Sequence, residues 1–550
     1  MHQTQRCIVI AKRIGRFAVF FLWMLALVTL VSCGATPAIV PERLQQSQAL
    51  AAQNEIRQFW SDATSVEVRI AFQQLNGKWP RAVGERFVLR MNELTDEWVK
   101  QYAATCDSEA RSASAVEVCD GAVRSCFQFT LHKQKAIVAV ARRIESSGLD
   151  VLDGTIDMIW VEIQSCTRSA VIQSHDAADS DELSQLARKY LAEAQLYQML
   201  LDERYESMLA KADAVAQKSA SRNVKVEVGL SVAWNLLLKN QQTEALTRIE
   251  KLSALATERQ LKIAMAYIDL LKGHGWFAQE KYKEAVASYR EALTQLQSLM
   301  GMASLPVAVT YSVIGQAYSQ MTEPVEAVKV RRKARDLFLK GLGKTSMYYA
   351  YENMLLAESL SDAGQNEDAL KIYEDALASF VAMYGLENPY AASVYSNMGT
   401  AYFMMGQNQR SIDMTENALD IQLALYGAHH WQVAFSYANL AVQYDVLGDH
   451  DQEASLYKKA LDIFIAVFGE QDDHTADTYH SLGMAYKKLE SFPLALQNFQ
   501  KALETRTSAE GEGSVKAGET VYQIRHLCDY HSYAPACNGD SEELTEPPNM

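Results

Sequence analysis

A glycine recurs every 42 residues along the second half of the chain, and this spacing restricts the possible folds more than any other feature. A fixed period of this length indicates a structural unit that is repeated and stacked on its neighbours. The chain has 550 residues, which is long for one globular domain but ordinary for a stacked array. The series consists of Gly301, Gly343, Gly385, Gly427, Gly469 and Gly511.

Each 42-residue unit predicts a pair of amphipathic helices. Apolar residues follow i, i+3, i+4, i+7 spacing in 437–447 and again in 457–468. A turn at Gly448 separates the two runs, and turn glycines recur at Gly364 and Gly406. β-Propeller blades share this period, but they require several short alternating strands, which these runs do not show. The repeated unit is therefore expected to be a helical hairpin.

Small residues occupy further positions of the lattice and allow two helix backbones to approach closely. The pattern resembles tetratricopeptide repeats, whose small-small-aromatic signature appears in NMGTAY (397–402) and SLGMAY (481–486). The extra length per unit resembles the kinesin-light-chain-like variety. The resemblance implies an all-α fold, a right-handed α-solenoid of tetratricopeptide hairpins. The main column of small residues is Gly273, Gly315, Ala357, Gly399, Ala441 and Gly483.

The lattice sets the expected domain boundaries. Six repeats fill residues 259–510, degenerate helical hairpins fill 181–258, and 511–550 form a C-terminal tail. The lattice glycine, such as Gly469, is expected to end the second helix in a left-handed conformation. One departure is Ala454, which stands one place out of register with the alanines of other repeats.

The N-terminus predicts export. Basic residues precede an apolar stretch of about 15 residues, which is too short to favour a permanent transmembrane helix. The sequence LVSC resembles a bacterial lipobox, which implies a signal peptide in 1–32, lipidation of Cys33 and a lipidated tether in 33–45. This resemblance further implies attachment to the outer membrane, facing the periplasm. An uncleaved signal anchor is the alternative.

The net charge of −15 argues against nucleic acid and against an anionic lipid surface as partners. Membrane contact is therefore expected only through the lipid anchor. Six cysteines remain after the signal and the lipid site, and an even number in an exported chain suggests disulfides, with buried free thiols as the alternative. Cys528 and Cys537 form a local candidate pair. The other four would pair among themselves in one of three ways: Cys106, Cys119, Cys126 and Cys166.

Residues 46–180 do not follow the lattice but are expected to form a helical N-terminal domain. Trp98, Cys106, Cys126 and Cys166 resemble, in order and rough spacing, a helical segment that precedes extracytoplasmic repeat arrays in certain bacterial serine/threonine kinases. The kinase domain itself is missing, because the chain has no glycine-rich loop after a strand, no His-Arg-Asp and no Asp-Phe-Gly.

The sequence contains no recognisable catalytic or cofactor motif. HExxH, P-loop, GxSxG and EF-hand patterns are absent. Histidines near the repeat junctions, such as His430 and His474, are expected to be exposed or capping residues rather than metal ligands. We therefore expect no enzyme activity, no cofactor and no metal site.

A binding surface is the remaining interpretation. In the family that the chain resembles, first helices line a groove, and an asparagine often reaches the backbone of a bound peptide. Asn397 and Asn439 match that position, and an amide can both donate and accept. Alternatively, these asparagines cap or bridge neighbouring hairpins. Family analogy places seven more residues on this face: Leu355, Ser481, Thr400, Phe403, Phe435, Val442 and Glu358.

The sequence thus predicts a lipid-anchored envelope scaffold that binds a protein or peptide. One alternative is an outer-membrane assembly or pilot factor that delivers a client. Another is a ligand sensor or enzyme seated in residues 46–180.

Overall fold

The computed structural model describes residues 56–75, 78–108, 182–199, 204–258, 261–510 and 515–531, together with isolated positions 54, 131, 134, 137, 138 and 141. Over these residues every regular element is an α-helix, and no strand is present. The expected all-α class is confirmed. The chain forms two compact units, of which unit 1 ends at Gly385 and unit 2 begins at Leu386.

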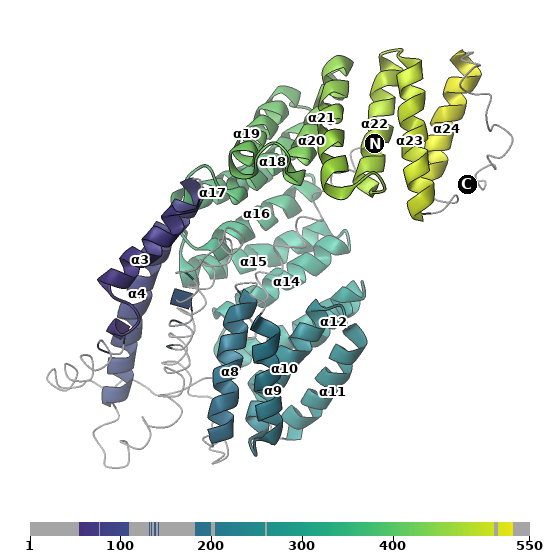
Figure 1. Ribbon diagram of the computed structural model, residues 1–550. Helices are drawn as coiled ribbons and strands as arrows, with labels where there is room; N and C mark the ends of the chain where they lie inside the picture. Colours follow the sequence, from purple (N-terminus) through teal and green to yellow (C-terminus); the bar gives the residue numbers. More distant parts are fainter. Residues whose placement is uncertain are drawn as a thin grey trace. The chain divides into compact units, whose positions relative to one another are not determined.

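Unit 1 begins with helices that lie outside the 42-residue lattice (Figure 1). In the first pair, the longer helix buries Trp98 completely. Two helical pairs follow in the segment where weaker hairpins were predicted, and the helices within each pair pack together. The bounds are α3 (Asp62–Gln73), α4 (Lys78–Ser108), α8 (Glu182–Met199), α9 (Arg204–Lys218), α10 (Arg222–Leu238) and α11 (Gln242–Glu258).

The lattice region of unit 1 consists of three hairpins. In each, a first helix packs against the second helix that follows it. The first helices are α12 (Lys262–Ala278), α14 (Leu305–Gln320) and α16 (Met347–Asp362). The second helices are α13 (Tyr282–Met300), α15 (Pro324–Leu342) and α17 (Asn366–Tyr384).

Unit 2 continues the same alternation. Its first helices are α18 (Pro389–Met404), α20 (Trp431–Leu447) and α22 (Asp473–Lys488). Its second helices are α19 (Asn408–Tyr426), α21 (His450–Phe468) and α23 (Phe492–Glu510). Second helices begin at intervals of 42 residues from Tyr282 to Phe492, as in 324 − 282 = 42. The sequence period is therefore the period of the helical hairpin.

The junction glycines end the second helices, as predicted, but in a different conformation. Gly469 has φ +90° and ψ 171°, and its N–H donates to the carbonyl of Ile465. Gly301, Gly343, Gly385 and Gly427 share the positive φ and extended ψ. This region is almost restricted to glycine, unlike the left-handed helical region that was expected. The backbone thus requires glycine at each described junction.

The turns inside the hairpins also have positive φ, and Gly448, with ψ 10°, adopts the left-handed helical conformation. Gly364, Gly406 and Gly448 have φ between 70° and 78°, whereas Thr322 and Glu490 hold the equivalent turns with φ 55°. Residues other than glycine can enter this region at a cost of about 1–2 kcal/mol. The turns therefore tolerate substitution where the junctions do not.

Small residues in the first helices do allow close helix packing. A Cβ atom built on Gly399 would lie 2.7 Å from Oγ1 of Thr415, and one on Gly483 would lie 2.8 Å from the Phe499 ring. Ordinary contacts between carbon atoms are about 3.5–4.0 Å. The predicted role of this column is therefore observed at both positions.

The segment expected to be a C-terminal tail begins with a helix, α24 (Val515–His531). It starts 42 residues after α22, since 515 − 473 = 42, and it packs against α23. Arg506, buried in α23, donates to Oδ1 of Asp477 at 2.7 Å and to the carbonyl of Lys516 at 2.8 Å. The lattice thus extends by one first helix, which a buried arginine holds in place.

Several sequence predictions lie at or beyond the edges of the described residues. Cys106 is on α4 and Cys528 is on α24. Cys119, Cys126, Cys166, Cys537 and the lipidation candidate Cys33 lie outside the described residues, so the pairings and the anchor stay predictions. Within the described ranges, no helix has the length and apolar character needed to cross a bilayer.

Candidate functional site

The nine residues predicted to line a binding surface are divided between the two units. Leu355 and Glu358 are in α16 of unit 1. Unit 2 holds the others: Asn397, Thr400 and Phe403 on α18, Phe435, Asn439 and Val442 on α20, and Ser481 on α22.

In unit 1, nearly every residue of α16 is buried. Leu355 is only 5% exposed, so it packs inside the unit rather than on an open surface. Glu358 is half-buried. Its charge adds to the effect of burial, which raises the pKa of Tyr351 and of Tyr373. Leu355 therefore belongs to a packed interior, whereas Glu358 is partly exposed.

The two asparagines of unit 2 remain open to solvent. Asn397 and Asn439 are half-buried, and among the described residues neither side chain makes a hydrogen bond to the protein. Bridges between consecutive helices α19 and α20 come from other polar side chains. Ser436 donates to Oε1 of Gln422 at 2.6 Å, and Nε2 of Gln443 donates to Oγ1 of Thr415 at 2.8 Å. The alternative in which the asparagines bridge the hairpins is therefore not what the structure shows.

Other predicted residues on α20 contribute to packing. The Phe435 ring makes edge contacts with Phe464 and His474, both at 5.0 Å between ring centroids. Val442 is partly buried against the same apolar cluster. Both side chains thus pack against the cluster while remaining partly exposed.

On α18 and α22 the predicted residues are only half-buried. They are Thr400, Phe403 and Ser481. The hydroxyl of Thr400 donates to the carbonyl of Ser396 within its own helix, at 3.3 Å.

The first helices α18 and α20 carry almost no charge. No Asp, Glu, Lys or Arg occurs in α18, and Asp445 is the single charged residue of α20. The second helices α19 and α21 carry many charged residues, most of them exposed. Large apolar side chains are also exposed at the C-terminal ends of α18 and α20: Met404 at 47%, Val446 at 53% and Leu447 at 48%. Helices α18 and α20 of unit 2 thus carry an almost uncharged surface, which we call the neutral face.

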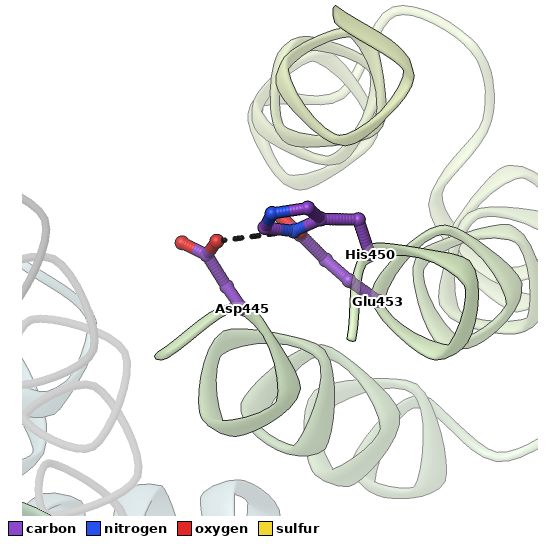
Figure 2. A group of neighbouring side chains, drawn as sticks. All are labelled: Asp445, His450 and Glu453. Carbon is purple, nitrogen blue, oxygen red and sulfur yellow. Dashed lines mark hydrogen bonds and ion pairs between the residues drawn. The ribbon is translucent and has the colours of Figure 1, made fainter. Parts of the chain in front are cut away.

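A charged cluster lies at the end of α20, and Figure 2 shows three of its members, Asp445, His450 and Glu453. Nδ1 of His450 lies 2.9 Å from Oε2 of Glu453 and 3.6 Å from Oδ1 of Asp445. Lys488, from α22, contacts Asp445 and lies 3.2 Å from Oε1 of Glu453. The cluster therefore joins three consecutive helices of unit 2.

Glu453 is the unusual member of this cluster. It is 2% exposed and occupies the lattice position of Ala327, Ala369 and Ala495. Burial raises the pKa of its carboxyl group, whereas His450 and Lys488 act in the opposite direction. The shifted Ala454 in the sequence reflects this replacement and not a change of register, because α21 begins on the lattice at His450.

Asp445, His450 and Glu453 also present one possible metal-ligand atom each within 4.8 Å of one another. The sequence did not predict this grouping. Lys488 already supplies a positive charge to both carboxylates, so a divalent cation would have to displace its ammonium group. The cluster is thus a satisfied ionic network.

Comparison with known proteins identifies the repeats. Residues 349–423, 390–466 and 447–508 match the tetratricopeptide repeat family model. This part of the chain therefore carries tetratricopeptide repeats. No curated protein matches the sequence.

Similar solved structures include a kinesin light chain of Podosopora anserina with nearly identical TPR-like repeats, 18% identical, covering 36% of this chain and 95% of that one, with a TM-score of 0.33. BtubC from P. vanneervenii is 21% identical, and the match covers 44% of this chain and 92% of BtubC, with a TM-score of 0.34. The apo form of the quorum sensor NprR from B. thuringiensis is 15% identical. The match covers 65% of this chain and 96% of NprR, with a TM-score of 0.47.

Proposed function

We propose that this protein is a non-enzymatic scaffold that binds a protein or peptide segment on the neutral face of unit 2. The observation that carries the proposal is the pair of half-buried asparagines, Asn397 and Asn439, whose side-chain amides have no hydrogen-bond partner among the described residues. They sit 42 residues apart, at the same position of successive first helices. Each can donate to and accept from a peptide backbone whatever the partner's side chains.

The composition of the surrounding surface supports an interface. Interfaces are depleted in charged residues at their centre and enriched in aromatic residues and methionine. The neutral face combines Phe403 and Met404 with the two asparagines, while charges are confined mainly to the second helices. An uncharged surface loses little solvation energy when a partner covers it.

The test is site-specific photo-crosslinking in the full chain. A photoreactive residue in place of Asn397 or Asn439 should form an adduct with a partner in cells. The matched control is Asn417, which is exposed on the second helix α19. Adducts at Asn417 but not at the other two positions would refute binding on the neutral face.

A second test removes the amides. The Asn397→Ala/Asn439→Ala variant should lose the partner that is identified by crosslinking, whereas Asn417→Ala should retain it. Circular dichroism should show unchanged helix content in both variants. Equal retention by both would move the binding site away from these asparagines.

We further propose that the scaffold is anchored in the cell envelope, at the outer membrane, through a lipid on Cys33. This rests on the basic and apolar N-terminus and the LVSC sequence. Replacement of Cys33 by Ser should abolish incorporation of labelled fatty acid and release the protein from the membrane fraction. Retention of the label by the variant would disprove this site.

A further inference from the structure

We infer that the segment bound by the neutral face is itself uncharged over the residues that contact α18 and α20, and carries at least one large apolar side chain. The inference rests on the proposed function and specifies the chemical class of the partner. It follows from two properties of α18 and α20: they expose large apolar side chains, and they have no free charge.

The neutral face has no uncompensated charge with which a ligand charge could pair. Asp445 is the single charged residue of α18 and α20, and Lys488 already contacts it. Burying an unpaired charge at an interface is strongly unfavourable, because its hydration is lost without a compensating partner. A Lys, Arg, Asp or Glu side chain placed against this face would therefore weaken binding.

Several charged side chains near the neutral face already have partners within unit 2. On α22, Asp477 is paired with Arg506 at 2.7 Å and with Lys516 at 3.2 Å. Lys487 donates to Oε1 of Gln523 on α24 at 2.9 Å. The acidic groups Asp445 and Asp477 are thus paired with cations inside unit 2, and α18 and α20 offer no free charge to a partner.

The exposed apolar side chains define what the partner should contribute. Met404, Val446 and Leu447 are each about half exposed at the C-terminal ends of α18 and α20. An apolar side chain that covers them gains about 25 cal/mol per Å² of apolar surface removed from water. Methionine adapts to side chains of different shape, which suits a segment whose sequence can vary. Backbone groups of the segment would bond to the amides of Asn397 and Asn439.

The experiment is selection of random twelve-residue peptides, displayed on phage, against the purified full chain. Selected peptides should be depleted of Asp, Glu, Lys and Arg at their central positions and enriched in Leu, Met, Phe or Tyr. A synthetic peptide from the selected set should bind about tenfold less tightly when one central residue is replaced by Asp, and similarly for Lys. Peptides enriched in either charge would overturn the inference.

A matched pair of variants ties the effect to the neutral face. Met404→Lys places a charge on α18, whereas Val467→Lys places one on the second helix α21 at similar exposure, 42% for the parent residue. Met404→Lys should weaken binding of the uncharged peptide and should shift the selected peptides towards acidic sequences. Val467→Lys should behave like the parent. Equal effects of the two variants would overturn the inference.

Failure of the inference can be distinguished from failure of the proposed function. Charged peptides that are selected, and then lost by the Asn397→Ala/Asn439→Ala variant, would leave peptide binding at this face intact and overturn only the charge selectivity. Selection of no peptide above background would overturn both.

Discussion

Lys488 reaches from α22 to the buried carboxylate of Glu453 on α21, with 3.2 Å between Nζ and Oε1. The two residues are 35 positions apart and belong to successive hairpins. A charge that occupies an alanine position is therefore neutralised by the next repeat. This contact makes the order of the hairpins specific at that point of an otherwise similar array.

Replacement of Lys488 by Met should destabilise unit 2 by about 2 kcal/mol, because a buried carboxylate loses its counter-charge. The estimate is below that for a fully buried pair since the Lys488 side chain is 27% exposed. Glu453→Ala restores the residue found in other repeats and should be nearly neutral. Urea unfolding should show that Glu453→Ala removes most of the cost of Lys488→Met. Additive effects of the two substitutions would argue against the pair.

The pH dependence of stability should report Glu453 directly. Its pKa is raised by burial, so its proton is held more tightly in the folded state. Such a group contributes stability below its unfolded pKa, and that contribution is lost as the pH rises through the folded pKa. The free energy of unfolding of the parent, minus that of Glu453→Gln, should therefore fall as the pH rises above about 4.3, the ordinary pKa of a glutamate. A difference that rises with pH would contradict this assignment.

The two classes of glycine should respond differently to alanine. Gly469→Ala should cost about 2 kcal/mol, because alanine is excluded from its extended, positive-φ conformation. Gly406→Ala, in a left-handed turn, should cost about 1 kcal/mol. Chemical denaturation of the full chain measures both. A cost at the turn equal to or greater than that at the junction would refute the distinction.

The reverse substitution provides the control for the turn. Thr322→Gly removes the strain of a positive φ but adds chain entropy to the unfolded state, so a gain of about 0.5 kcal/mol is expected. A loss of stability would show that the Thr322 side chain itself stabilises the turn.

Unit 1 also contains a buried ion pair, and both of its members can be replaced by the residues that stand 42 positions further along the chain. Nη1 of Arg331 donates to Oε1 of Glu352 at 3.3 Å, and both are almost fully buried. Glu352→Val alone should cost about 3–5 kcal/mol, because it strands a buried guanidinium. Arg331→Tyr/Glu352→Val uses the residues at the equivalent positions 373 and 394 and should recover most of that loss, measured by thermal unfolding. No recovery would mean that the surrounding packing requires the pair.

Most of the hairpin architecture could be predicted from the sequence, because the turn and junction residues are set by local backbone conformation. Gly469 was correctly placed at a helix end, although its ψ value could not be derived from a glycine alone. The charged cluster was not predictable, since Glu453 depends on a lysine supplied by another hairpin. The burial of Leu355 was not predictable, because it depends on tertiary packing and not on the repeat position of the residue.

The last described helix, α24, affects how the array can unravel. In a stack where each hairpin is stabilised by its immediate neighbours, the terminal hairpin has one neighbour fewer and frays first. Helix α24 covers Phe499 and Leu496 of α23 with Leu527, and Arg506 ties it to α22 through Asp477. Within the described part of the chain, α24 therefore has to be released before the hairpin of α22 and α23 can fray, and that hairpin is an interior member of the stack.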